Sequence, residues 1–278
     1  MIPAAFEYER AESPDHAIEL LGRFGDEAKL LAGGHSLLPL MKLRLARPTA
    51  LVDIGRVSEL SYVREDGDTI AIGALTRHHD VHHDPLLMQH CPIVAHVAGM
   101  VGDPQVRHRG TIGGSVAHAD PASDFLAVFL TLGAQMVVRG PSGERTVDAA
   151  NFFKGLFESD LAVDEVLLEI RVPKTGAGWS YQKFHRRSVD WAVVGVAALA
   201  SRSNGNVDWR IALTNMSDRP LRATAMEEAL SSGSDPATAA AEVSRDTSPP
   251  SDHFASGQYR REVAKVIARR AVEEALAR

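Results

Sequence analysis

The stretch Gly110-Thr111-Ile112-Gly113-Gly114-Ser115 is the feature around which this chain is organised. It leads into Asp120-Pro121-Ala122-Ser123-Asp124 and then into the apolar residues 125–132. Glycine has no Cβ and lets a backbone approach a ligand, and successive free N–H groups in such a turn form a concave nest for a phosphate. A similar segment lies upstream, where the apolar residues 28–32 run into Gly33-Gly34-His35-Ser36-Leu37. Two such turns predict a ligand with two phosphates, held from both sides.

Composition and charge exclude several classes of protein. With 278 residues, 45% of them hydrophobic and 24% charged, the chain is expected to form about two domains of an ordinary globular protein. A net charge of −6 without a long basic run gives no electrostatic footprint for nucleic acid. No signal pattern and no apolar run of ~20 residues is present, so we expect a cytoplasmic protein without a membrane span. The single cysteine, Cys91, cannot form a disulfide or an iron–sulfur cluster by itself, so redox chemistry would require an organic cofactor.

The first 56 residues alternate between strand and helix patterns. Ser13-Pro14 is typical of a helix N-cap followed by proline in the first turn. Strands are expected at residues 6–9, 28–32 and 51–54, and a short helix at 37–43. These elements predict a small βαβ-type unit, with its Gly33-Gly34 turn at the carboxyl end of a strand, where ligands bind in such sheets.

Residues 57–175 are expected to form a second unit. Asp66-Gly67-Asp68 lies between two short apolar runs and predicts a hairpin. The other elements expected here are helices at 76–88 and 92–100, a helix from about Ala122, and strands at 134–138, 145–147 and 166–170. A polar, arginine-containing loop at 103–109 leads into the glycine stretch. The Gly176-Ala177-Gly178 tract predicts a domain boundary, since exposed glycine-rich linkers commonly mark one.

Residues 176–278 show a different pattern. Strands at 180–185, 193–201 and 208–214 predict an antiparallel meander, with Asn204-Gly205 as a hairpin turn. Helices are expected at 221–231, 236–244 and 259–277. The chain is therefore expected to divide into residues 1–56, 57–175 and 176–278.

Each polar motif also has an ordinary structural interpretation. Neither glycine pair belongs to a G-x-G-x-x-G or a Walker motif, which disfavours a simple nicotinamide or nucleotide-triphosphate enzyme. The histidine pairs at 78–79 and 82–83 have i,i+4 spacing suited to a metal, but a solvated helix face is favoured. Asp120 or Asp124 could cap a helix or accept hydrogen bonds from a ribose or ribityl hydroxyl. His35 could contact the ligand or orient its own loop.

Three motifs, in their order and spacing, carry a resemblance to a known family. They are residues 32–37 (AGGHSL), residues 105–114 (QVRHRGTIGG) and residues 117–124 (AHADPASD). Together they resemble the FAD-binding medium subunits of the molybdenum hydroxylases (the xanthine dehydrogenase family), and most closely those of the carbon monoxide dehydrogenase type. The likeness extends over essentially the whole chain. Ser115 stands where relatives commonly have Asn or Asp, and Val189 where many have glycine.

The resemblance implies an α+β protein with a vanillyl-alcohol-oxidase-like (PCMH-type) FAD-binding fold. Its two subdomains would be residues 1–56 and 57–175. A C-terminal α+β domain, residues 176–278, would follow, with a three-stranded antiparallel sheet and helices, of the type found in carbon monoxide dehydrogenase flavoproteins.

The resemblance also implies roles for particular residues. Residues 32–36 and 111–115 would wrap the FAD pyrophosphate, Asp124 would contact FAD hydroxyls, and Leu167 would cover the adenine end. Lys183 would reach the flavin from the C-terminal domain, and Trp191 would lie beside the isoalloxazine. The cofactor-binding candidates are Ala32, Gly33, Gly34, His35, Ser36, Leu37, Val101, Thr111, Ile112, Gly113, Gly114, Ser115, Ala117, Asp124, Leu167, Lys183 and Trp191. No catalytic residue and no metal ligand is assigned.

The function implied is electron transfer within a molybdenum hydroxylase complex. A large subunit with the molybdenum cofactor and a small subunit with [2Fe–2S] clusters would be the partners, in a dimer of heterotrimers. FAD would pass electrons to an external acceptor such as a quinone, NAD or oxygen. Two alternatives stay open: a self-contained flavin-dependent oxidase or dehydrogenase, which requires a base over the flavin, and a non-enzymatic scaffold subunit, which requires no flavin.

Overall fold

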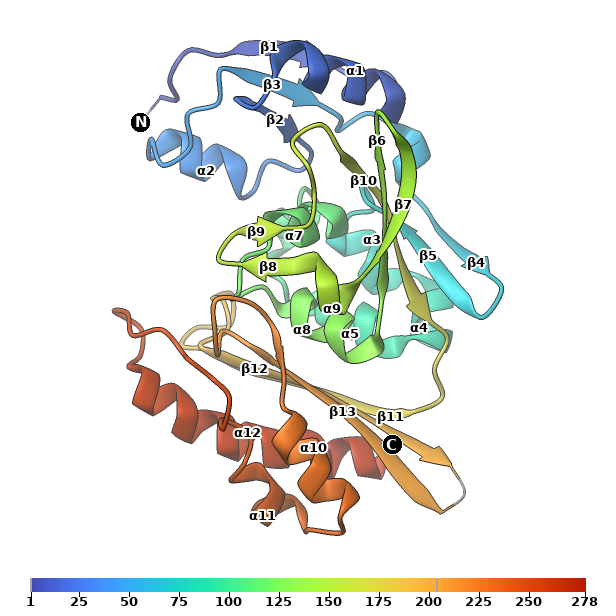
Figure 1. Cartoon of the computed structure of the whole chain (residues 1–278), viewed down its shortest axis with the longest axis vertical. Coiled ribbons are helices and arrows are strands. Elements are labelled where there is room, and N and C mark those ends of the chain that lie inside the picture. Colours follow the sequence, from blue (N-terminus) through green and yellow to red (C-terminus); the bar gives the residue numbers. More distant parts are fainter. Residues whose placement is uncertain (1, 204) are drawn as a thin grey trace.

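The computed structural model describes residues 2–203 and 205–278. The three larger sheets follow one another along the long axis of the molecule, with the N-terminal sheet at one end and the C-terminal sheet at the other (Figure 1). Helices and sheets are mixed within each part, which confirms the α+β class. How the chain divides into domains at residues 56 and 175 stays a prediction.

The N-terminal sheet is the βαβ-type unit that the sequence predicts. Its strands are β1 (Glu7–Arg10), β2 (Ala28–Leu31) and β3 (Ala50–Asp53), in the order β1-β3-β2 and all parallel. Helix α1 (Pro14–Phe24) begins as expected, because the Ser13 hydroxyl accepts the His16 N–H at 3.0 Å. Helix α2 (Leu37–Lys42) follows the Gly33-Gly34 turn at the carboxyl end of β2.

The middle sheet has five antiparallel strands in the order β4-β5-β10-β6-β7. These strands are β4 (Val63–Asp66), β5 (Thr69–Gly73), β6 (Gln135–Gly140), β7 (Gly143–Asp148) and β10 (Val166–Pro173). The helices around it are η1 (Ser58–Leu60), α3 (His78–His83), α4 (Pro85–His90), α5 (Pro92–Met100), α6 (Pro104–Arg107), α7 (Ile112–His118), α8 (Asp124–Leu132) and α9 (Ala149–Phe152). A two-stranded sheet, β8 (Phe153–Gly155) and β9 (Glu158–Ser159), completes this part.

Two expectations for this region were wrong. The helix expected at 76–88 is divided into α3 and α4, because Asp84 precedes a proline and is extended (φ −72°, ψ 122°). The Asp84 carboxylate then caps α4 by accepting two N–H groups. The glycine stretch is not an open turn, since α7 begins at Ile112 with Thr111 as its N-cap. Gly113 and Gly114 therefore lie in the first turn of a helix.

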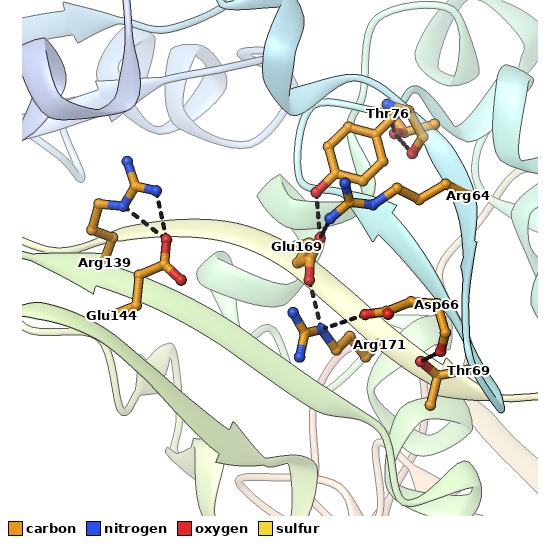
Figure 2. A network of polar contacts seen from close by, with 9 residues as sticks. Arg64, Asp66, Thr69, Thr76, Arg139, Glu144, Glu169 and Arg171 are labelled. Carbon is orange, nitrogen blue, oxygen red and sulfur yellow. Dashed lines mark hydrogen bonds and ion pairs between the residues drawn. The ribbon is translucent and has the colours of Figure 1, made fainter.

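A buried carboxylate on β10, that of Glu169, connects this strand to the segment that contains β4. Glu169 is 3% exposed and accepts from Arg171 Nε at 2.6 Å and from Arg64 at 3.3 Å. The Tyr62 hydroxyl also donates to it. Figure 2 shows this network between β10 and the β4–β5 hairpin. Burial would raise the pKa of Glu169, but the hydroxyl and the two guanidinium groups hold that pKa below its usual range.

The C-terminal sheet is covered on both faces. Its strands are β11 (Gly178–Phe184), β12 (Val194–Ser203), β13 (Asn206–Thr214) and β14 (Leu221–Arg222), all antiparallel. Along β12, Val196 and Ala198 pack in the core with α10 (Thr224–Ser231), α11 (Pro236–Ala240) and α12 (Gly257–Ala277). Ala197 and Leu199 face the other way and join the core around α8. Every residue of α8 is buried as a result.

The three-stranded sheet was an incomplete prediction, since β14 adds a fourth strand. Leu221 pairs with Leu213 and Arg222 with Ala212, so the expected helix at 221–231 begins only at Thr224. Helix α11 ends at Ala240 rather than at 244, and turns follow. Asn204, the first residue of the expected hairpin turn at 204–205, lies outside the described residues. Among the helices of the described ranges, none is long and apolar enough to cross a membrane.

Candidate cofactor-binding site

The structure brings the two glycine segments into contact, as the sequence predicts. A Cβ built on Gly33 would lie 2.2 Å from the carbonyl oxygen of Arg109 and 2.9 Å from Cα of Gly110. Only a glycine lets the two backbones approach so closely. The loop after β2 and the loop before α7 are therefore in direct backbone contact.

The first segment presents free N–H groups. Within the part of the chain that the structure describes, the N–H groups of Gly34, His35 and Ser36 donate to no protein acceptor. Gly34 has φ +75°, in the left-handed region that favours glycine. The His35 ring makes a 3.0 Å hydrogen bond with the Gly33 carbonyl through Nδ1, so this side chain orients its own loop. Successive unpaired N–H groups of this kind suit an anion.

The second segment is built differently. The N–H groups of Ile112, Gly113 and Gly114 all donate within the protein. Their acceptors are Thr76 O at 3.0 Å, Ala74 O at 2.9 Å and Thr111 Oγ1 at 3.2 Å, respectively. A Cβ on Gly113 would lie 2.5 Å from the Ala74 Cβ. The expectation of free N–H groups was therefore wrong here: these glycines allow α7 to pack against residues 74–76.

His78 packs against the second segment and contacts both of its ends. It is 2% exposed, its ring stacks on Phe125 at 5.4 Å, and its backbone N–H donates to the Gly110 carbonyl at 3.1 Å. Its Nε2 lies 3.3 Å from Ser115 Oγ. Burial, with smaller contributions from Arg107 and His35, lowers the pKa of His78 to about 4. The imidazole is therefore neutral at physiological pH.

A buried ion pair connects α8 to the C-terminal sheet. Asp124 is 5% exposed, and its Oδ2 lies 2.7 Å from Lys183 Nζ. Its Oδ1 accepts from the Tyr181 hydroxyl at 2.6 Å. Lys183 also donates to the Met100 carbonyl at 3.2 Å. Burial raises the pKa of the Asp124 carboxyl, whereas Lys183 and then Tyr181 act to lower it.

The remaining candidates are spread around these two features. Leu167 is buried on β10, and Ala117 is exposed on α7. Val101 follows α5, and its carbonyl accepts from Arg107 at 3.1 Å. Trp191 is 69% exposed in the loop between β11 and β12. Ala32 and Leu37, at the two ends of the first segment, are half-buried.

Sequence reasoning missed two residues of this region. His78 was considered only as part of a possible metal site, and Tyr181 was given no role at the site. The spacing of Tyr181 and Lys183 carried a signal, because residues two apart on a strand share a face. Over residues 2–203 and 205–278, no group of three His, Cys, Asp or Glu side chains could hold a metal ion.

Comparison with known proteins gives the family. Residues 4–175 match the FAD binding domain in molybdopterin dehydrogenase, and residues 179–275 match the CO dehydrogenase flavoprotein C-terminal domain. The chain is 42% identical to the carbon monoxide dehydrogenase medium chain of Hydrogenophaga pseudoflava, over 100% of this chain and 99% of that one. The chain belongs to the FAD-binding medium subunits of the molybdenum hydroxylases.

Other members of this medium-subunit family are similarly related. The glyceraldehyde dehydrogenase medium chain of Sulfolobus acidocaldarius is 39% identical, with 99% of each chain covered. The solved structure of Hydrogenophaga pseudoflava carbon monoxide dehydrogenase lacking the Mo-pyranopterin moiety superposes with a TM-score of 0.96. It is 43% identical and covers 100% of this chain and 99% of that one. The cofactor of this medium subunit is FAD, and the protein is a subunit of an oxidoreductase.

Proposed function

We propose that the FAD pyrophosphate binds to the N–H groups of Gly34, His35 and Ser36. These groups have no other acceptor within residues 2–203 and 205–278, which suits the two negative charges of a pyrophosphate. The second glycine segment holds this loop in place through the contact between Gly33 and Arg109. Thr111 and Ser115 contribute hydroxyl groups at the edge of the site.

The Asp124–Lys183 pair marks the other end of the proposed site. It joins α8, which follows the second glycine segment, to the first strand of the C-terminal sheet. A lysine held there supplies a buried positive charge for the flavin ring, and the carboxylate supplies an acceptor for FAD hydroxyls. Val101, Ala117, Leu167 and Trp191 complete the proposed contacts.

The proposed function is electron transfer within a complex. Bound FAD accepts electrons and releases them to a second carrier. The single observation that carries the proposal is the cysteine content of this FAD-binding chain. Its one cysteine, Cys91, is buried, and burial raises the pKa of its thiol to about 12. Such a thiol is no ligand for a cluster, so any cluster that supplies electrons belongs to another chain, and we propose a small [2Fe–2S] subunit.

The substrate is then oxidised elsewhere, in a large subunit with the molybdenum cofactor. Related medium chains belong to enzymes named for carbon monoxide and for glyceraldehyde, although the two chains are similarly close to this one in sequence, at 42% and 39% identity. We propose a cytoplasmic dimer of heterotrimers, in which this chain delivers electrons to a quinone, NAD or oxygen.

The test is the visible absorption spectrum of the complex purified through a tag on this chain, with its subunits resolved on a gel. The proposal predicts flavin bands together with iron–sulfur absorption, and both a large and a small companion. A flavin in this chain alone, bleached by a small substrate without partners, would contradict it and support a self-contained enzyme. Absence of flavin from the complex would leave only a scaffold.

A further inference from the structure

The Asp124 carboxylate, at the start of α8, is held by two side chains of β11. Its two oxygens are bound by two residues of β11, the Tyr181 hydroxyl at 2.6 Å and the Lys183 ammonium at 2.7 Å. Tyr181 and Lys183 lie two residues apart, so both side chains project from the same face of the strand. The family resemblance implied a role for the carboxylate and for the lysine, but not for the tyrosine that binds the other oxygen of the carboxylate.

A glycine on the next strand makes room for the tyrosine hydroxyl. Gly195 of β12 pairs with Lys183 of β11. A Cβ built on Gly195 would lie 2.6 Å from the Tyr181 hydroxyl oxygen and 2.9 Å from Cβ of Thr214. Any larger residue at 195 would push the hydroxyl out of its place on Asp124. Two positions, 181 and 195, are therefore fitted to one hydrogen bond.

We propose that Tyr181 is a positioning residue for the flavin end of the site. By binding one oxygen of Asp124, its hydroxyl directs the other oxygen to Lys183 and so fixes where that cation lies. This inference rests on the proposed function, in which Lys183 faces the flavin. Without the hydroxyl, the buried carboxylate has one hydrogen-bond donor fewer. The orientation of the carboxylate, and with it the position of the Lys183 ammonium, is then no longer fixed.

The burial of all three groups makes the arrangement rigid. The side chains of Lys183 and Asp124 are 2% and 5% exposed, and Tyr181 is buried with them. Burial and the neighbouring Asp124 raise the pKa of Tyr181 far above its usual value, so the phenol keeps its proton and acts as a donor. Water has little access to replace the hydroxyl. A change at residue 181 is therefore transmitted to Asp124 and Lys183.

The chain contains a matched control. The Tyr62 hydroxyl donates to Glu169. This carboxylate is also buried, and it is paired with the basic side chains of Arg64 and Arg171 (Figure 2). Neither Tyr62 nor Glu169 belongs to the proposed cofactor contacts. Tyr62→Phe and Tyr181→Phe therefore delete the same group from the same kind of bond, and only one of them is at the site.

The experiment measures FAD dissociation from the purified complex, by the rise of flavin fluorescence, and the flavin midpoint potential. Tyr181→Phe should raise the FAD dissociation constant about tenfold, because one hydrogen bond to a charged group is lost, and should shift the potential. Both variants should lower the thermal midpoint of unfolding, because each loses one hydrogen bond to a buried carboxylate. Tyr62→Phe should nevertheless change FAD affinity by less than about twofold and leave the flavin potential unaltered. Equal effects of the two variants on FAD would overturn the inference.

Two further variants keep the outcomes distinct. Lys183→Met tests the proposed function: if it leaves FAD affinity and potential unchanged, Lys183 does not face the flavin and the basis of the inference is lost. If Lys183→Met changes both while Tyr181→Phe changes neither, only the positioning role is wrong.

Gly195→Ala displaces the hydroxyl without removing it, and it serves if Tyr181→Phe does not fold. It should weaken FAD binding in the wild-type background. Where Tyr181→Phe folds, the same substitution in that background should have a smaller effect, since one of the atoms with which it collides is absent and only Thr214 remains. Equal effects in both backgrounds would contradict the proposed fit.

Discussion

The two glycine segments look alike in sequence and differ in structure. In the first, Gly34 has a positive φ and the following N–H groups are free. In the second, the N–H groups of the first turn of α7 are all used, and Gly113 is in contact with Ala74. The first segment therefore offers donors to a ligand, whereas the second acts as a brace that holds the first in place.

This difference shows that a glycine pair indicates that another group lies close to the backbone. It does not indicate whether that group is a ligand or another part of the protein. Gly33 and Gly113 are both required by neighbouring backbone, since a Cβ built on them would lie 2.2 Å from the Arg109 carbonyl oxygen and 2.6 Å from the Ala74 carbonyl oxygen, respectively. Gly34 is required by its own dihedral angle. Substitutions at the brace should therefore lower stability, and substitutions at the free loop should lower FAD affinity.

The largest effect is expected for Gly113→Val. The new side chain collides with the Ala74 backbone and separates α7 from residues 74–76, so the free energy of unfolding should fall by about 3 kcal/mol. Urea unfolding of the full-length chain measures this loss. Gly22→Ala is the control, because Gly22 lies in α1 with nothing within 4 Å of its added Cβ. It should stabilise the chain by up to about 1 kcal/mol. A Gly113→Val protein of wild-type stability would show that the brace does not exist.

The buried imidazole beneath the brace predicts a pH dependence. The pKa of His78 is lowered from 6.5 to about 4 in the folded chain, so the unfolded chain binds a proton first as the pH falls. The contribution of the neutral His78 to the free energy of unfolding is therefore complete above pH 6.5. It is lost between pH 6.5 and pH 4 and amounts to roughly 3 kcal/mol. His78→Gln, which does not titrate, should lack this part of the loss. Unfolding free energies of both proteins across this range provide the measurement, and parallel curves would contradict the prediction.

Gly34→Ala sharpens the comparison from the side of the free loop. Its positive φ makes alanine unfavourable by about 1 kcal/mol, and the strain turns the neighbouring N–H groups. FAD affinity should fall about tenfold. Gly67→Ala is the matched control, since Gly67 has φ +59° in the β4–β5 turn with open space around it. It should lose similar stability and no FAD affinity. Titration of FAD fluorescence distinguishes the two, and equal affinities would place the pyrophosphate elsewhere.

The smallest effect is expected for Ser115→Ala. This change removes a single 3.3 Å contact with the neutral His78, worth about 1 kcal/mol or less. FAD affinity should change by less than about threefold. A loss as large as that of Gly34→Ala would mean that the second segment also binds the pyrophosphate directly.

Local patterns predicted much of this structure. The N-cap at Ser13, the βαβ-type unit and the order of strands and helices follow from capping residues and apolar periodicity. The division of the helix at Asp84 was also readable from Pro85, but the apolar run concealed it. Strand β14 could not be predicted in this way, because its two residues form a strand only by pairing with β13.

The site was predictable in its residues but not in its contacts. The motifs identify Asp124 and Lys183, yet their ion pair depends on the C-terminal sheet packing on α8. Which N–H groups stay free also depends on distant residues, here 74–76, and no local pattern contains that information. Residue-by-residue assignments to FAD therefore stay predictions.

Amide hydrogen exchange with and without FAD tests the difference between the two segments most directly. The amides of Gly34, His35 and Ser36 should exchange rapidly in the FAD-free chain and become protected when FAD binds. The amides of Ile112, Gly113 and Gly114 should be protected in both states. Exchange of the second segment that slows on FAD binding, with the first segment unchanged, would contradict the account.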